Sequence, residues 1–441
     1  MASTEEPSIA SGEVVDISSV SGAPQQSERS PGARLWHNRG FNIFWAGQLL
    51  SAMGDSFVLL AMPLLVFDAT GSVAQMGLVT GTFGVGQIVS GLVSGVIVDR
   101  VDRRRLMILC DLLRLALYGS IPLVWLLMGP QLWLIYVVVA LGAMLGMTFQ
   151  VAMITALTNL VDRDQLTDAN ARASASFSLA LVIGPLLAGV LSARVGPVAS
   201  VAVDALSFAI SALTLTWIRL RRASAERPTE SSGASLRRTA ADFIEGIHFL
   251  LDQPVIRVVT LLLAGLSFVM AGMMDLFIFH LKNDLHQSDN AIGLLVGLAG
   301  IGGVGGGLAA PWLRRRVGFG ASWLGGWALT GISCVLIGLA PSLWPILICA
   351  VGYTFGDVLS GTNSYTLRQE LTPDHLLGRV TATFWTITGI ASPVGAASLT
   401  LLASRVGGSA AIVIGGLGFV GLTIIGFFTP ARRRYPERDM A

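Results

Sequence analysis

The sequence carries little charge for its length. Lys, Arg, Asp and Glu together make up 13% of its 441 residues, whereas 53% of the residues are hydrophobic. A soluble domain has roughly 25% charged residues, so this composition excludes a soluble globular protein. With a mean hydropathy of +0.69, the composition predicts an all-α integral membrane protein whose helices cross the bilayer many times.

Metal-binding and nucleophilic residues are also scarce. The cysteines lie in apolar runs and the few histidines are scattered, so the sequence predicts neither a disulfide framework nor a metal site. It contains no GxxxxGK[ST] phosphate-binding loop, and no spacing places a nucleophile beside a histidine and an acid. We therefore expect no enzyme activity, no cofactor and no nucleic-acid partner.

Apolar runs divide the chain into two halves. Residues 1–33 are rich in Ser, Glu, Pro and Gly, which predicts a disordered cytoplasmic tail without a signal peptide. Twelve apolar runs follow, each near the ~20 residues that a membrane helix needs. Six fall within residues 34–218 and six within 255–429, and the seventh is predicted to run unbroken from Val255 to Leu281. Residues 219–254 form a polar linker, and residues 430–441 form a second cytoplasmic tail.

The basic residues indicate the orientation. With the first tail inside, the connections on that side hold nearly all the arginines, and the opposite side holds only Arg194, Lys282 and Arg405. This bias predicts a multi-pass protein of the inner (plasma) membrane with both termini in the cytoplasm. In the linker, apolar residues recur at helical spacing up to Leu251, which predicts an amphipathic helix. That helix lies either on the membrane surface or against the protein's own underside.

The two halves repeat one pattern. The segments that begin at Leu160 and Leu371 each run from an acidic loop into a helix with a proline in mid-span, Pro185 or Pro393, and each leaves through Arg-Val-Gly. The repeat predicts two pseudo-symmetric six-helix halves, which is a transporter architecture. In such folds the substrate site lies near mid-membrane between the halves.

A charged turn interrupts the apolar chain. The stretch "GVIVDRVDRRRL" resembles the G-x-x-x-D-R-x-x-R-R loop between the second and third helices of the major facilitator superfamily. Gly95, Asp99, Arg100, Arg103 and Arg104 match that loop position by position. The corresponding turn of the second half, "APWLRRRVGFG", keeps the arginines and lacks the aspartate. The resemblance implies a major facilitator fold with 12 transmembrane helices.

Two further stretches are similar to one branch of that superfamily. The first apolar run, from Phe44, resembles the first helix of the enterobactin, macrolide and tetracycline-type efflux carriers. "VIGPLLAG" resembles the G-P-x-x-x-G element of drug–proton antiporters, here Gly184, Pro185 and Gly189. The resemblance implies proton-coupled efflux of a small amphipathic compound (a drug, antibiotic or secondary metabolite) by rocker-switch alternating access.

Other functions remain open at this point. A siderophore exporter or a nutrient importer would share the same fold, and a non-transporting membrane receptor or scaffold could keep it as well. For the transporter, the expected partners are the small-molecule substrate, protons and the lipid bilayer, and we expect a monomer.

For the charged turn, the resemblance implies a conformational latch. Asp99 would face the start of the eleventh helix, and the arginines would pair with acids such as Asp162 to close the cytoplasmic side. Alternatively, the arginines only set the topology, although topology does not require Asp99.

Acids within membrane spans are rare and usually functional. Asp55 and Asp357 have no basic neighbour within a helical turn, so we predict that they bind a proton or a cationic substrate, with Asp275 as a third candidate. Asp204 lies in a polar stripe and either joins this pathway or bonds neighbouring helices. Asp111 and Arg114 are three residues apart, which predicts mutual neutralisation and a structural role.

Overall fold

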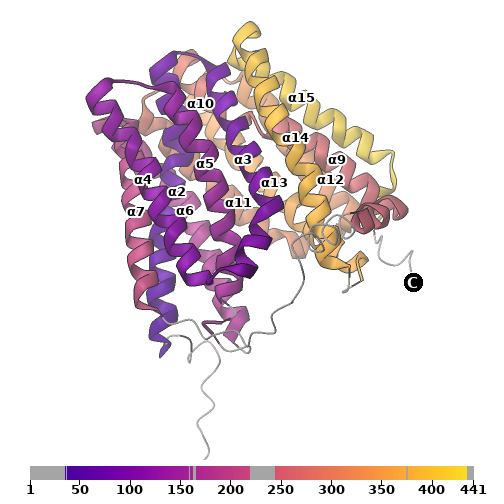
Figure 1. The fold of residues 1–441 in the computed structure, drawn as a ribbon. Helices are drawn as coiled ribbons and strands as arrows, with labels where there is room; N and C mark the ends of the chain where they lie inside the picture. The colour runs from indigo at the N-terminus through magenta and orange to yellow at the C-terminus, as the bar shows by residue number, and fades with distance from the viewer. Residues whose placement is uncertain are drawn as a thin grey trace, which may run out of the picture.

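The computed structural model describes residues 35–218, apart from 36, 158 and 162–164, and residues 244–434, apart from 374 and 375. Within these residues the secondary structure is helical throughout. Figure 1 shows the helices of the first half, indigo to magenta, on one side of the molecule and those of the second half, red to yellow, on the other. The first predicted tail, residues 435–441 of the second tail and most of the linker lie outside the described residues.

Residues 35–218 form six long helices in the part of the chain that the structure describes. They are α2 (Arg39–Thr70), α3 (Val73–Arg100), α4 (Arg103–Met128), α5 (Leu132–Leu157), α6 (Leu166–Val195) and α7 (Pro197–Trp217). We call the end of the bundle where α2 begins the proximal end and the end where α2 finishes the distal end. The helices then alternate in direction between the two ends.

The second half repeats this arrangement. Its elements are α9 (Pro254–Met270), α10 (Met273–Phe279), the π-helical turn η3 (His280–Asp284), α11 (Asp289–Val317), α12 (Phe319–Leu339), α13 (Leu343–Leu371), α14 (Leu377–Val406), α15 (Gly408–Phe427) and the short turn η4 (Pro430–Arg432). The predicted seventh span is confirmed as one span, Pro254–Asp284, but its helix is not continuous, because it is interrupted at Ala271 and Gly272. At this break a Cβ at Gly272 would lie 3.2 Å from Leu399 Cβ and 3.4 Å from the backbone of Ala396 in α14, which is a tight contact.

Length and composition suit these helices to a membrane. Eleven spans in the described residues are long and apolar enough to cross a bilayer, with α9, α10 and η3 counted as one. Helix α3, with 28 residues, completes the two sets of six. The prediction of an all-α protein with two six-helix halves is therefore confirmed.

Side chains at the helix ends fix where several helices start. Asp102 accepts a hydrogen bond from the backbone N–H of Arg105 at 2.9 Å and so caps the first turn of α4. Asn38 and Ser72 cap α2 and α3 in the same way. Since the first N–H groups of a helix have no partner within the helix, such caps satisfy them. One of the two aspartates of the charged turn thus starts a helix.

Two pairs of helices join the halves. Helix α6 packs along α11, and α3 packs along α14. Within each half the tightest packing is α2 and α4 on α7 in the first half, and α11 and α12 on α13 in the second. Small residues allow such close approach in membranes, where packing and hydrogen bonds rather than the hydrophobic effect hold helices together.

The linker helix packs against the protein itself. Residues 244–252 are helical, and Leu250 is 3% exposed. Glu245 accepts a hydrogen bond from Arg379 at the start of α14. Of the two placements that the sequence left open, the described residues favour the underside of the second half, although Ile244 and Leu251 stay exposed.

The packing of α11 on α13 can be tested at Gly306. A Cβ at Gly306 would meet the carbonyl oxygen of Phe355 and the amide of Leu359, which are backbone atoms and cannot turn away. We expect Gly306→Ala to destabilise the protein by about 1–3 kcal/mol through overpacking. The control, Gly361→Ala, adds the same methyl group in α13 with nothing within 4 Å. Thermal unfolding in detergent should show a lower Tm for Gly306→Ala only, and equal Tm values would contradict the packing.

Candidate functional site

One arginine and one aspartate form an ion pair in the middle of the first half. Arg114 of α4 donates from Nη2 to Oδ1 of Asp55 in α2 at 2.5 Å. The side chain of Arg114 is 9% exposed, whereas that of Asp55 is 48% exposed. The arginine end of the pair is therefore enclosed by the helices, and the carboxylate end is accessible.

Two more aspartates lie beside this pair and are fully buried. Asp204 of α7 accepts a weak hydrogen bond from Ser207 at 3.4 Å through Oδ1, and its Oδ2 has no partner in the described part of the chain. Asp111 of α4 is 0% exposed, and neither of its carboxylate oxygens has a hydrogen bond to a described residue, although Ser211 lies beside it. Buried polar groups without partners are rare in folded proteins, so these carboxyls are places where a proton or a cation would be stabilised.

Gly54 brings the carboxylates close together. A Cβ at Gly54 would meet Asp204 Oδ1 and Ser207 Oγ, so only glycine lets α2 lie this close to α7 beside Asp55. One turn and a half earlier, Gln48 donates to the Ser211 hydroxyl at 3.0 Å and ties the same two helices together. The sequence Gly54-Asp55 thus combines the close approach with the carboxylate that uses it.

An aromatic ring stacks against the guanidinium of Arg114. The guanidinium carbon of Arg114 lies 3.8 Å from the ring centroid of Phe208, which is fully buried in α7. A cation held over an aromatic face is attracted by the ring quadrupole, and the attraction strengthens when water is excluded. The stacking leaves the Nη2 group of Arg114 directed to Asp55.

The charges of this cluster do not balance. Three carboxyl groups, on Asp55, Asp111 and Asp204, surround one guanidinium on Arg114. With every carboxyl ionised, the excess negative charge would lie in a low-dielectric region, where uncompensated charge is costly. The arrangement can therefore take up protons or a cationic group, and Asp55 is the member that such a species can reach.

The partner predicted for Arg114 is wrong. The spacing in the sequence paired it with Asp111 on the same helix, yet the guanidinium bonds Asp55 from another helix. Asp55 therefore has a basic partner, contrary to its isolation in the sequence. The physical reason is that a long arginine side chain reaches a neighbouring helix as easily as its own next turn, and Phe208 holds it in that direction.

The remaining predicted acids lie apart from this cluster. Asp275 is buried in α10 beside Thr80 of α3, at a contact between the halves, and its Oδ2 has no partner among the described residues. Asp357 lies in the middle of α13 in the second half and is partly exposed. Of the four acids predicted as a pathway, the structure thus brings Asp55 and Asp204 together, while Asp275 and Asp357 are separate.

The charged turn is described only in part. Arg104 donates from Nε to the carbonyl of Leu215 at 2.7 Å and from Nη2 to that of Thr216, so it caps the last turn of α7. The surroundings of Gly95, the side chain of Asp99 and the whole of Asp162 lie outside the described residues. Arg100 and Arg103 remain at the boundary of α3 and α4, and the latch stays a prediction.

The Gly184-Pro185-Gly189 element lies where the halves meet. A Cβ at Gly189 would meet the backbone of Gly293 and Asp289 in α11, and a Cβ at Gly293 would meet the carbonyl of Pro185. Gly184 faces Ser56, one residue after Asp55. The element thus packs α6 against the other half on one side and against the helix of Asp55 on the other.

An ion pair that the sequence did not predict joins the halves at the distal end. Lys282 of η3 lies 2.8 Å from Asp68 of α2 and 2.6 Å from Asp289 of α11. Asp68 belongs to the first half, whereas Lys282 and Asp289 belong to the second. Lys282 is the only lysine in the sequence, and this singular residue is the signal that could have pointed to the contact.

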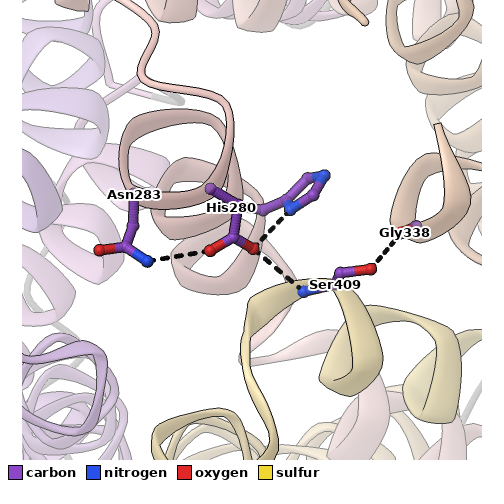
Figure 2. Close-up of polar contacts among 5 residues, drawn as sticks. His280, Asn283, Gly338 and Ser409 are labelled. Carbon is purple, nitrogen blue, oxygen red and sulfur yellow. Dashed lines mark hydrogen bonds and ion pairs between the residues drawn. The ribbon is translucent and has the colours of Figure 1, made fainter. Parts of the chain in front are cut away.

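Figure 2 shows how the π-helical turn that carries Lys282 is anchored. Asp284 is joined to His280 Nδ1 at 2.8 Å and accepts from the backbone N–H of Ser409 at 3.3 Å. The Ser409 hydroxyl in turn donates to the carbonyl of Gly338 at the end of α12. These bonds fix η3 to α12 and α15, so Lys282 reaches across to Asp68 from a fixed position in the second half.

Comparison with known sequences gives one family and a set of efflux proteins. The model of the Major Facilitator Superfamily matches residues 44–396 and 273–439. The multidrug efflux pump Tap of Mycolicibacterium fortuitum is 28% identical over 89% of this chain and 95% of its own length. Macrolide efflux protein A of Streptococcus pyogenes is 25% identical over 83% of this chain and 90% of its own. The enterobactin exporter EntS of Citrobacter koseri is 28% identical over 86% and 89%.

Solved structures of transporters share the fold at low sequence identity. The nucleoside transporter NupG aligns with a TM-score of 0.68 at 11% identity, over 88% of this chain and 98% of its own. A bacterial homologue of the lysosomal transporter Spinster, in an inward-facing and unoccupied conformation, aligns with a TM-score of 0.67 at 15% identity, over 90% and 96%. At this identity the likeness concerns the fold alone.

The pairing of Arg114 with Asp55 can be tested by a double-mutant cycle. We expect Arg114→Gln and Asp55→Asn each to lower the stability of the purified protein, and the double variant to lose less than the sum. The expected coupling is about 1–3 kcal/mol, because the two side chains are in direct contact. Thermal unfolding in detergent measures it. Arg114→Gln combined with Asp252→Asn, an exposed acid of the linker helix, should be additive, and additivity of the first pair as well would contradict the ion pair.

Proposed function

The chain belongs to the Major Facilitator Superfamily, and from this membership we propose that it exports small amphipathic organic compounds in exchange for protons. It is a multi-pass membrane transporter, and its substrate is a small molecule. Three of its relatives are named as efflux proteins or exporters, which supports the outward direction. The compounds we propose are drugs, antibiotics or secondary metabolites.

The proposal of proton exchange rests on one observation, the ion pair between the half-exposed carboxylate of Asp55 and the buried Arg114. When Asp55 binds a proton, it loses its charge and its hold on the guanidinium. Arg114 can then turn to Asp111 or Asp204, both of which lie beside it. A cationic group of the substrate would compete with the proton for Asp55, and such competition couples the two movements.

The same cluster defines the order of events in the proposal. Substrate reaches Asp55 from the cytoplasm and displaces a proton, and a proton from outside later displaces the substrate. Asp357 of α13 and Asp275 of α10 extend the pathway into the second half. Because excess charge in the membrane is costly, the site stays near neutrality by carrying either a proton or a cation.

Alternating access in this proposal depends on the contacts between the halves. Following the arginine bias of the sequence, we take the proximal end as cytoplasmic. The contact of Gly189 with Gly293 and the Lys282–Asp68 pair lie toward the distal end, so the described conformation is closed to the outside. In the opposite state the charged turn with Asp99 and Arg100, together with Asp162, would close the cytoplasmic side.

A siderophore is the second candidate substrate. The similarity to an enterobactin exporter favours it, and the fold accommodates either cargo. The carboxylates around Arg114 favour a cationic or neutral compound over an anionic one. A panel of compounds that spans both charge classes would separate them.

Transport into inverted membrane vesicles tests the proton exchange. With an acidic interior imposed, we expect uptake of a cationic dye or drug by the wild type. Asp55→Asn should reduce this uptake to the level of vesicles without the transporter, because no proton can then be exchanged. Exchange of labelled for unlabelled substrate, which needs no net proton movement, should weaken as well, because the cationic group of the substrate also loses its partner.

Asp252→Asn, the same change at an exposed linker position, is the matched control and should keep gradient-driven uptake. Unchanged uptake and pH dependence in Asp55→Asn would rule out the carboxylate as the proton carrier. Full substrate exchange in Asp55→Asn would show that the cationic group of the substrate does not bind this carboxylate.

The distal ion pair yields a prediction about conformation. Nitroxide labels on Val195→Cys and Val406→Cys, exposed equivalent positions at the distal ends of α6 and α14, report the separation of the halves there. Lys282→Gln should shift the label distances to longer values, because Asp68 loses its partner in the other half. Lys282→Arg keeps the charge and should retain the short distances. An unchanged distribution in Lys282→Gln would show that glycine packing alone closes this end.

A further inference from the structure

Six arginines lie at the proximal end of the second half. Arg314, Arg315 and Arg316 form the last turn of α11, and Arg432, Arg433 and Arg434 follow α15 near the end of the described chain. We call these six residues the basic patch. The two runs are more than a hundred residues apart in sequence, and hydrogen bonds hold them against each other.

Backbone hydrogen bonds hold the patch together. They attach residues 432–434, which we call the strap, to the start of α12. The N–H of Phe319 donates to the carbonyl of Arg434 at 2.9 Å, and the N–H of Gly320 donates to that of Arg433 at 3.1 Å. These are the first N–H groups of α12, which have no partner within the helix. Arg434 closes the arrangement with a hydrogen bond from Nη2 to the carbonyl of Arg316 at 3.0 Å. The backbone of the strap therefore caps a helix and places its arginines beside those of α11.

Two glycines make room for the strap. Gly318, with φ +89°, has a conformation that L side chains rarely adopt, and a Cβ there would meet Arg434. A Cβ at Gly320 would meet the backbone of Arg432. The turn "RRRVGFG" thus provides three arginines and then a surface on which three more are seated.

The arginines of the patch differ in their exposure. Arg314 pairs with Glu370 and is partly buried. Arg315, Arg316 and the three arginines of the strap are exposed. The corresponding turn of the first half contains Asp99 and Asp102, whereas residues 310–320 contain no acid. The second copy of the turn therefore has arginines without acids, and the strap places three more arginines beside it.

The surroundings of the patch identify its ligand as a lipid. It lies at the ends of the spans α11 and α15, at the level of the membrane boundary. Trp312 lies one turn before Arg316 and is 52% exposed. The guanidinium carbon of Arg316 is 5.3 Å from the centroid of its ring. Tryptophan is enriched at the boundary between membrane and water. Guanidinium groups bind phosphate oxygens in pairs, and juxtamembrane clusters of four to eight basic residues attract anionic lipids.

We propose that the basic patch binds the headgroup of an anionic phospholipid of the adjoining leaflet, with Arg315, Arg316 and Arg432 on the phosphate and Trp312 at the start of the acyl chains. The site requires only that the proximal helix ends lie at the membrane surface. It is independent of the substrate, the direction of transport and the proton coupling. The bound lipid would hold the C-terminal strap on the turn between α11 and α12.

Native mass spectrometry of the purified transporter, titrated with phosphatidylglycerol or phosphatidylcholine, tests this site. We expect the wild type to retain phosphatidylglycerol in preference to phosphatidylcholine. Arg315→Gln/Arg316→Gln should weaken phosphatidylglycerol binding by about 5- to 25-fold, at about fivefold for each arginine. Arg432→Gln, which leaves the α11 turn intact, should weaken it by about fivefold.

Arg194→Gln/Arg405→Gln is the matched control, because both arginines are exposed in the last turns of their helices at the distal end. This variant should bind phosphatidylglycerol as the wild type does. Equal weakening in the control, or none in the patch variants, would overturn the proposal. Displacement of the lipid by millimolar inorganic phosphate would also overturn it, since the patch would then be a site for a soluble anion.

Discussion

A cation buried within a membrane span needs a neutralising partner beside it. Arg114 is such a cation, and the packing of the first half depends on this need. Its side chain is 9% exposed, and its guanidinium is stacked on Phe208 and bonded to Asp55. Removing one partner from a buried charge pair is strongly destabilising, because the other charge stays behind. Helices α2, α4 and α7 must therefore keep their positions relative to one another. This requirement explains why Gly54, which permits that approach, directly precedes the carboxylate.

Glycine contacts and ion pairs divide the task of joining the halves. The contact of Gly189 with Gly293 sets backbones against each other and depends on shape alone, whereas the pair of Lys282 with Asp68 depends on charge. Close-packed contacts between helices lose much of their van der Waals attraction within about 1 Å of separation, whereas the attraction of an ion pair falls only as the inverse of the distance. The combination gives the distal end a broad packed surface and one contact whose attraction persists as the halves begin to separate.

The sequence predicts the architecture well because the signals for spans are strong. Apolar runs, the arginine bias and the repeat around Pro185 and Pro393 together predict two six-helix halves, and the structure confirms them. The break at Ala271 and Gly272 was missed, because a short interruption does not disturb the apolar run. The site was predicted only in part. Asp55 stood out as an acid in a span, but its partner lies on a helix 59 residues away, and sequence spacing carries information only about the same helix.

Residue spacing in the sequence could not predict the ion pairs of Lys282 either. Their arrangement lowers the free energy needed to separate the halves. The ammonium group is shared between Asp68 in the first half and Asp289 in its own half. If the halves separate, Lys282 keeps Asp289, which is 10% exposed, and Asp68, already 38% exposed, passes into water. Neither half is left with an unpaired buried charge. The ion pair that closes the distal end can thus be broken and formed again at a low cost in free energy, because each half is stable without it.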